Sequence, residues 1–162
     1  MTTNAQYLDQ LMASLNSDTI YLQQAFDYYH QQYLGNECAQ QFVADSALIS
    51  AELKQHPSAG LCDRTLGLKL PKRKTLEGGA IRGSLQRQGL LLPTGGERFR
   101  GCIVFPLTDG QGQIISAIGY RYAQRIRAWQ QEIISWSKPS IDDYFCSGLS
   151  LVDELIYGKA LH

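Results

Sequence analysis

Two apolar segments of strand length, residues 102–107 and 113–118, flank a turn in this 162-residue chain. Together they are rich in Ile, Val and Phe, the residue types that strands favour. Between them, residues 109–112 read Asp-Gly-Gln-Gly, and aspartate and glycine accept the backbone conformations that a tight turn requires. This pattern predicts an antiparallel β-hairpin around which the rest of the chain is organised.

Arginine residues border the predicted hairpin at its outer end. Arg98 and Arg100 precede the first segment, and Arg121 follows the second. Because a hairpin brings the outer ends of its two strands together, we expect these three cations to converge at one end of the ribbon. Phe99 lies between two of them, and the alternation of its neighbours favours a place in the core.

The first third of the chain has the apolar spacing of helices. Longer helices are predicted over residues 5–16 and 19–34, and two shorter helices are expected after them. The expected N-caps, all of residue types that cap helices well, are Ser17 or Asp18, Asn36 and Ser46. Residues 1–60 are therefore expected to form a helical layer.

The remaining chain, residues 61–162, mixes short extended and helical patterns. The expected elements are an extended piece over 61–70, a loosened backbone at Gly78-Gly79, a helix over 80–88, a strand over 133–136, and a last helix between Asp142 and Gly158. The sequence predicts an α+β fold in a single domain, residues 1–162. In it, a helical N-terminal half precedes a small antiparallel sheet built on the central hairpin, with a C-terminal helix.

The formal net charge is zero, but the charges are unevenly distributed. Residues 1–60 carry six acidic side chains and one lysine, whereas residues 61–138 carry thirteen basic and five acidic side chains. A basic region within an acidic frame suits a polyanion, although it also suits an ordinary solvated surface. The candidate nucleic-acid contacts are Arg98, Arg100, Arg121, Lys72, Arg73, Lys74, Arg82 and Lys138, with Tyr120 for base stacking. For Tyr120 and Trp129, stacking on a base and packing in the core are both open.

Other classes of function find little support in the sequence. The cysteines and histidines are scattered without metal-ligand spacing, and adjacent acids such as Asp142-Asp143 point different ways on a helix. We expect no catalytic residue, no metal and no cofactor. No apolar run approaches the roughly 20 residues of a membrane helix, and Met-Thr-Thr-Asn does not open a secretory signal, so the protein is interpreted as cytoplasmic.

The hairpin also carries a family resemblance. Residues 98–107 read Arg-Phe-Arg-Gly-Cys-Ile-Val-Phe-Pro-Leu, and Asp109, Gly112 and Gly119-Tyr120-Arg121 follow. This series resembles the signature of bacterial DNA primases, in the N-terminal subdomain of their catalytic core. Residues 61–100 are similar to primase-like proteins of mobile elements, through Asp63-Arg64-Thr65-Leu66, Leu70-Pro71 and Ile81-Arg82-Gly83-Ser84-Leu85. Cys102 stands where the signature has an arginine, and Tyr120 where it has a glycine.

The resemblance implies a function without catalysis. Primases of this kind carry a zinc-binding module and a toprim fold whose acids bind the catalytic metals, and neither is recognised in this sequence. The chain is therefore expected to bind single-stranded DNA or an RNA/DNA hybrid, mainly through Arg98, Arg100 and Arg121. The implied protein partner is a replication protein that bears a toprim fold or a helicase.

An alternative interpretation belongs to another class of protein. The chain would be a mobile-element remnant that keeps the fold but serves as a protein-interaction module, with a homodimer as one expected form. Its surface would be the acidic helical layer or the C-terminal tail.

Overall fold

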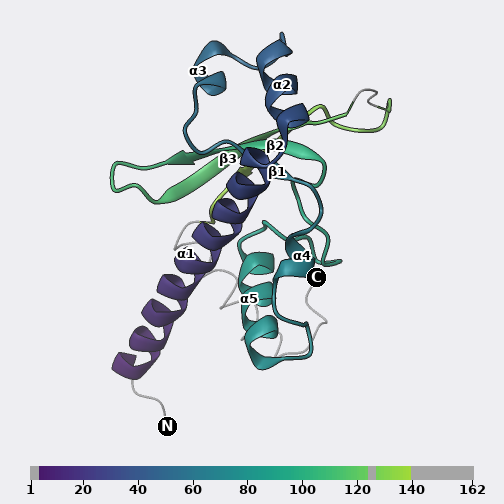
Figure 1. Cartoon of the computed structure of the whole chain (residues 1–162). Helices are drawn as coiled ribbons and strands as arrows, with labels where there is room; N and C mark the ends of the chain where they lie inside the picture. Colours follow the sequence, from purple (N-terminus) through teal and green to yellow (C-terminus); the bar gives the residue numbers. More distant parts are fainter. Residues whose placement is uncertain (1–3, 124–126, 140–162) are drawn as a thin grey trace.

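The computed structural model describes residues 4–123 and 127–139. Its longest element is α1 (Asn4–Leu34), which is one continuous helix (Figure 1). The prediction of two helices separated at Ser17 or Asp18 is wrong. Neither glycine nor proline interrupts α1, and a polar residue inside a helix costs only a fraction of a kcal/mol.

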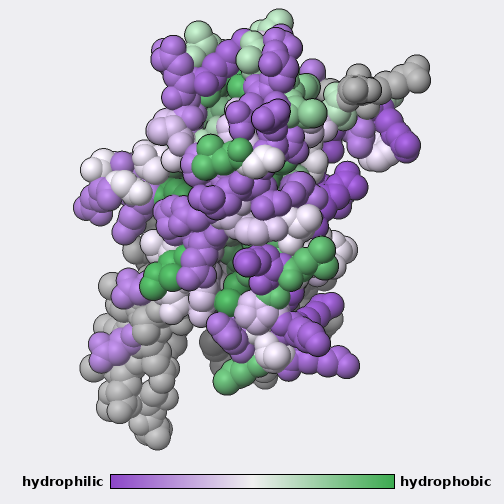
Figure 2. Space-filling model, in the orientation of Figure 1, coloured by the Kyte–Doolittle hydropathy of each residue, from purple (hydrophilic) through white to green (hydrophobic). Residues whose placement is uncertain are grey.

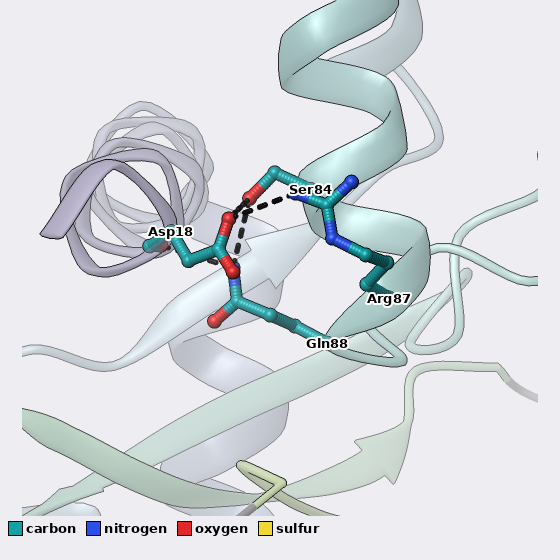
Figure 3. A network of polar contacts seen from close by, with 4 residues as sticks. All are labelled: Asp18, Ser84, Arg87 and Gln88. Atoms are coloured by element: carbon teal, nitrogen blue, oxygen red, sulfur yellow. Dashed lines mark hydrogen bonds and ion pairs between the residues drawn. The ribbon is translucent and has the colours of Figure 1, made fainter. Parts of the chain in front are cut away.

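Asp18 has a different role from the predicted N-cap. Its side chain is 2% exposed and accepts hydrogen bonds from Ser84 Oγ and from Arg87 Nη2, the latter at 3.2 Å (Figure 3). Gln88 Nε2 donates to the backbone oxygen of Asp18 at 2.9 Å. The partners belong to α5 (Leu76–Arg87) or follow it directly, so this buried network ties α1 to α5.

Two short helices follow α1. Asn36 caps α2 (Glu37–Asp45) as predicted, because its side chain accepts from the backbone N–H of Ala39. The helix predicted to start from Ser46 is wrong in its boundary. Instead, Ser50 caps α3 (Ala51–Lys54), and the intervening residues turn Ile49 into the core, where it is 3% exposed.

The sheet has four antiparallel strands in the order β1-β2-β3-β4. The strands are β1 (Gly60–Cys62), β2 (Cys102–Thr108), β3 (Ile114–Arg121) and β4 (Ile133–Ser137). The predicted hairpin is confirmed as β2 and β3, and Asp109 Oδ1 closes its turn by accepting from the backbone N–H groups of Gln111 and Gln113. The strand predicted over 133–136 is confirmed as β4.

The extended piece predicted over 61–70 is only partly correct. β1 ends at Cys62, and the helical turn α4 (Leu66–Lys69) follows. The loosened backbone expected at Gly78-Gly79 is wrong, since both glycines lie inside α5, which Thr75 caps. A Cβ at Gly78 would lie 2.1 Å from the backbone oxygen of Lys72, so a glycine lets the preceding loop cross the first turn of the helix.

Both faces of the sheet are covered, which explains the unbroken apolar run of β2. Cys102 and Val104 pack with α1 and α5 on one face, while Ile103 and Phe105 pack with α2 and the loop after it on the other. Figure 1 shows α4 and α5 beside α1, with α2 and α3 near its C-terminal end. The α+β prediction is confirmed. The predicted C-terminal helix lies outside the described residues, and no helix within them is long and apolar enough to cross a membrane.

Candidate nucleic-acid interface

The outer end of the hairpin is organised around Gly101. Its N–H donates to the backbone oxygen of Cys62 at 2.8 Å, and its own oxygen accepts from the N–H of Tyr122 at 2.7 Å. A Cβ placed at Gly101 would lie 3.6 Å from Nη2 of Arg64 and 3.8 Å from Nη1 of Arg121. Two guanidinium groups, one from the segment after β1 and one from the end of β3, therefore flank one backbone position at the end of the sheet.

Arg64 is absent from the candidates that the sequence suggested. It follows β1, at a backbone φ of 68°, and comes to this end of the sheet because Cys62 pairs with Cys102 across β1 and β2. Its side chain is exposed. The Asp-Arg-x-Leu series contains Arg64, but nothing in that series reveals a contact with the hairpin, since the pairing joins segments about 40 residues apart.

The three predicted hairpin cations have guanidinium groups beside three different glycines. Arg100 is exposed next to Gly101, and its Nη1 lies 3.5 Å from a Cβ placed at Gly96. Arg98 points elsewhere, because its Nε donates to the backbone oxygen of Gly89. Its guanidinium therefore holds the segment after α5 in place through this hydrogen bond. The guanidinium that lies beside Arg121 at Gly101 is therefore that of Arg64, whereas those of Arg100 and Arg98 lie beside Gly96 and Gly89.

The remaining predicted cations occupy two other places. Lys72, Arg73 and Lys74 form an exposed loop before α5, as expected. Arg82 is half-buried on α5, and its Nη2 donates to the backbone oxygens of Gly67 and Pro71 at 2.9 and 3.1 Å. These bonds hold the loop against the helix.

Lys138 lies at the opposite end of the sheet from Arg121. Its N–H donates to the backbone oxygen of Ile115, and its ammonium group donates to Thr19 Oγ1 at 3.1 Å. Ile115 and Arg121 are six residues apart on β3, which corresponds to roughly 20 Å at the usual rise of a strand. Lys138 therefore does not join the cluster at Gly101.

The aromatic side chains divide between core and surface. Tyr120 is 8% exposed and packs edge-on against Phe105, with ring centroids 5.8 Å apart, which favours a core role over base stacking. Phe99 is fully buried, as expected. Trp129 is 73% exposed and lies beneath Arg127, whose guanidinium carbon is 5.8 Å from the ring centroid. Of these rings, Trp129 has an accessible face.

A buried acidic cluster lies beside the arginines. Tyr29 Oη and Cys62 Sγ both donate to Glu97 Oε1, at 3.0 and 3.3 Å. Burial raises the pKa of Glu97, although Arg64 is near enough to oppose the shift. Burial also raises the pKa of the Cys102 thiol to about 11, against the opposing charges of Arg121 and Arg64. The Cys102 thiol is therefore protonated and inert at neutral pH.

The raised pKa of Glu97 predicts a pH-dependent stability. A group whose pKa is higher in the folded state stabilises the fold at low pH, and that contribution is lost as the pH rises through the folded pKa. Glu97→Gln keeps an oxygen acceptor for Tyr29 and has no charge to bury. We expect the variant to gain stability over the wild type as the pH rises from about 4.3, by about 1.4 kcal/mol for each unit of pKa shift.

Urea unfolding between acidic and mildly alkaline pH measures this effect. The exposed Glu52→Gln variant on α3 is the control, for which the stability difference from wild type is expected to be flat. A flat difference for Glu97→Gln as well would contradict the burial argument.

Few of the cations are neutralised by a neighbouring carboxylate. Within residues 4–123 and 127–139, Arg87 and Asp18 form the single ion pair with an N–O distance of 4.0 Å or less. Arg64, Arg100 and Arg121 therefore form no ion pair within that distance among the described side chains, although Glu97 lies near Arg64 and Glu132 near Arg121. Their charge remains available to an external anion.

Comparisons with known proteins identify the fold. No protein-family model matches the chain, and no curated protein sequence matches it significantly. Several solved structures, in contrast, do match the chain. The Aquifex aeolicus primase structure with zinc-binding and RNA polymerase domains is 21% identical with a TM-score of 0.56, covering 78% of this chain and 30% of that one. The DnaG primase catalytic domain bound to single-stranded DNA is 19% identical with a TM-score of 0.57, covering 81% and 40%.

The Escherichia coli primase catalytic core is 24% identical, with a TM-score of 0.51 over 76% of this chain and 40% of that one. At these identities the likeness shows a shared fold. This chain spans between 30% and 40% of the length of these structures. The described residues thus have a primase-like fold, which confirms the resemblance at the level of structure.

Proposed function

We propose that this protein is a nucleic-acid-binding module that holds single-stranded DNA, or an RNA/DNA hybrid, without polymerase activity of its own. The observation that carries the proposal is the pair of guanidinium groups, Arg64 and Arg121, that flank Gly101 and form no ion pair with a described carboxylate. With Arg100 and the loop cations of residues 72–74 they form what we term the basic track. Its members are Arg64, Arg121, Arg100, Lys72, Arg73 and Lys74.

The chemistry of the basic track suits phosphate. A guanidinium group offers paired N–H donors that match the oxygens of a phosphate, and these contacts read the backbone without reading sequence. Figure 2 shows that hydrophilic residues cover most of the face drawn there, with hydrophobic patches separated between them. The likeness to a DnaG primase catalytic domain bound to single-stranded DNA adds support, since this chain shares the fold of 40% of that domain.

In this proposal, a partner protein binds the catalytic metal ions. A replication protein with a toprim fold or a helicase would supply the chemistry, while this chain would position the strand. In the two-metal sites of polymerases, the metal ions stabilise the attacking and leaving oxygens of the displacement, and this proposal gives arginine and lysine side chains no such role.

Titration of a labelled oligothymidylate of about 12 nucleotides tests the proposal, since this length is within the roughly 4–16 nucleotides of single-strand binding folds. We expect fluorescence anisotropy to rise with a dissociation constant of about 1–100 μM at physiological salt, as for sequence-independent phosphate binding. An oligomer with an uncharged backbone is the control and should not bind. No rise in anisotropy with the charged strand, even at about 50 mM salt, would rule out the proposal.

A further inference from the structure

A groove of about 390 Å³ lies between α5 and the segment that follows it. Small-ligand sites usually measure about 300–1,000 Å³, so its size suits a small ligand or one unit of a chain. The lining residues from α5 recur at helical spacing on one face of the helix. They are Gly79, Arg82, Gly83 and Gln86, and the other lining residues are Arg73, Leu91, Thr94 and Gly95.

The charge of this groove distinguishes it from its neighbours. Arg73 and Arg82 line it, and none of the described lining residues carries a carboxylate. In the hollow beside Arg121, Glu132 balances the arginine. Two further hollows along α1 contain Asp27, and the described residues that line each of them carry a net charge of −1 when histidine is uncharged. An anion therefore has the strongest attraction to the groove on α5.

Arg82 is held in place before any ligand arrives. Its Nη2 donates to the backbone oxygens of Gly67 and Pro71, while none of the described residues bonds its Nη1. Its Nε–H is buried and has no partner among the described residues. A partly buried cation with unused donors gains from an anion, and a guanidinium already fixed in position loses little entropy when it binds one.

The groove leads towards the basic track. Gly95 lines it, and the next residue, Gly96, lies against the guanidinium of Arg100. Six residues separate Gly95 from Gly101, so the groove is within about 20 Å of the arginines at the hairpin end. A strand of a few nucleotides spans that distance.

We propose that the groove is a binding site for the phosphate group of a nucleotide, with Arg73 and Arg82 as its cations. Leu91 and Gln86 line the space beside them, where an apolar wall and an amide face the nucleoside. The inference rests on the proposed function in that the groove extends the same basic track. The phosphate belongs either to a bound strand or to a free nucleoside polyphosphate, and the two sources are separable by experiment.

Filling the groove without changing charge is the sharpest test. Gly79→Leu places a side chain inside the groove, where a Cβ meets nothing closer than the backbone oxygen of Arg73 at 3.9 Å. Ala80→Leu, one residue further along α5 and exposed, is the matched control. Arg73→Ala is a second variant that spares Arg82, whose bonds support the loop. Anisotropy is measured with the labelled oligothymidylate and with a fluorescent ATP analogue.

We expect Gly79→Leu and Arg73→Ala each to weaken binding at least fivefold, and Ala80→Leu to leave it within twofold. A loss for the strand alone assigns the site to a strand phosphate, a loss for the ATP analogue alone assigns it to a free nucleotide, and a loss for both supports a site for either. Equal binding by Gly79→Leu and Ala80→Leu for both probes overturns the proposal. If the wild type binds no strand, the proposed function fails, and the ATP analogue still decides on the groove.

Discussion

Replacing Arg64 and Arg121 together by alanine is expected to weaken the binding of single-stranded DNA roughly 30-fold. Each exposed guanidinium contact with a phosphate contributes about 1 kcal/mol, and each 1.4 kcal/mol is about tenfold in affinity. The two side chains flank Gly101 and form no ion pair with a described carboxylate, so their loss removes positive charge from one place on the surface. Fluorescence anisotropy at constant salt measures the effect.

A control variant that loses the same amount of charge elsewhere distinguishes the loss of a specific site from the loss of net charge. The double variant Lys54→Ala and Lys138→Ala removes the same amount of positive charge from other places. Lys54 lies on α3, and Lys138 follows β4 and lies beside the end of β3 that is far from Arg121. We expect this control to lose less than about threefold, because charges beyond a Debye length of about 10 Å are largely screened. Equal losses for both double variants would mean that overall charge, and no defined site, governs binding.

A large effect on stability is expected from Gly119→Ala in the centre of the sheet. A Cβ at Gly119 would lie 2.5 Å from Cδ1 and 3.0 Å from Cε1 of Phe99, whose side chain is fully buried. Overpacking a closed core costs about 1–3 kcal/mol, and we expect about 2 kcal/mol here. Urea unfolding gives the free energy of unfolding directly.

The control for this variant is on the same hairpin. A Cβ at Gly110, in the turn between β2 and β3, meets nothing within 4 Å, so Gly110→Ala should stay within about 0.5 kcal/mol of the wild type. Adding Phe99→Leu to Gly119→Ala should cost less than the two single changes summed, because the shorter side chain makes room. Similar stability for both glycine variants would refute this account of the core.

The parts of the fold that local chemistry determines were predictable from the sequence. The apolar segments and the turn at Asp109 predict the hairpin, and Asn36 predicts the start of α2 because asparagine is a common N-cap. The exposed loop at residues 72–74 follows from three adjacent cations. These features depend on residues close together in the chain, so their signals are visible without a structure.

The features that sequence reasoning missed depend on tertiary contacts. Asp18 resembles an N-cap, yet α5 surrounds it with hydrogen-bond donors and keeps it inside one long helix. Arg98 has the same chemistry as Arg100 but bonds Gly89, and Arg64 reaches the hairpin only through the pairing of β1 with β2. The alternative of a protein-interaction module, homodimeric or not, stays a prediction.

The salt dependence of strand binding tests the central claim most directly. For single strands, the logarithm of the binding constant falls with the logarithm of salt concentration by about 0.7 for each phosphate contact. We therefore predict a steep negative slope for the wild type between about 50 and 200 mM salt, and a slope shallower by about 1.4 for the Arg64→Ala and Arg121→Ala double variant. Identical slopes for the two proteins, or binding that does not respond to salt, would contradict the basic track as a phosphate-binding surface.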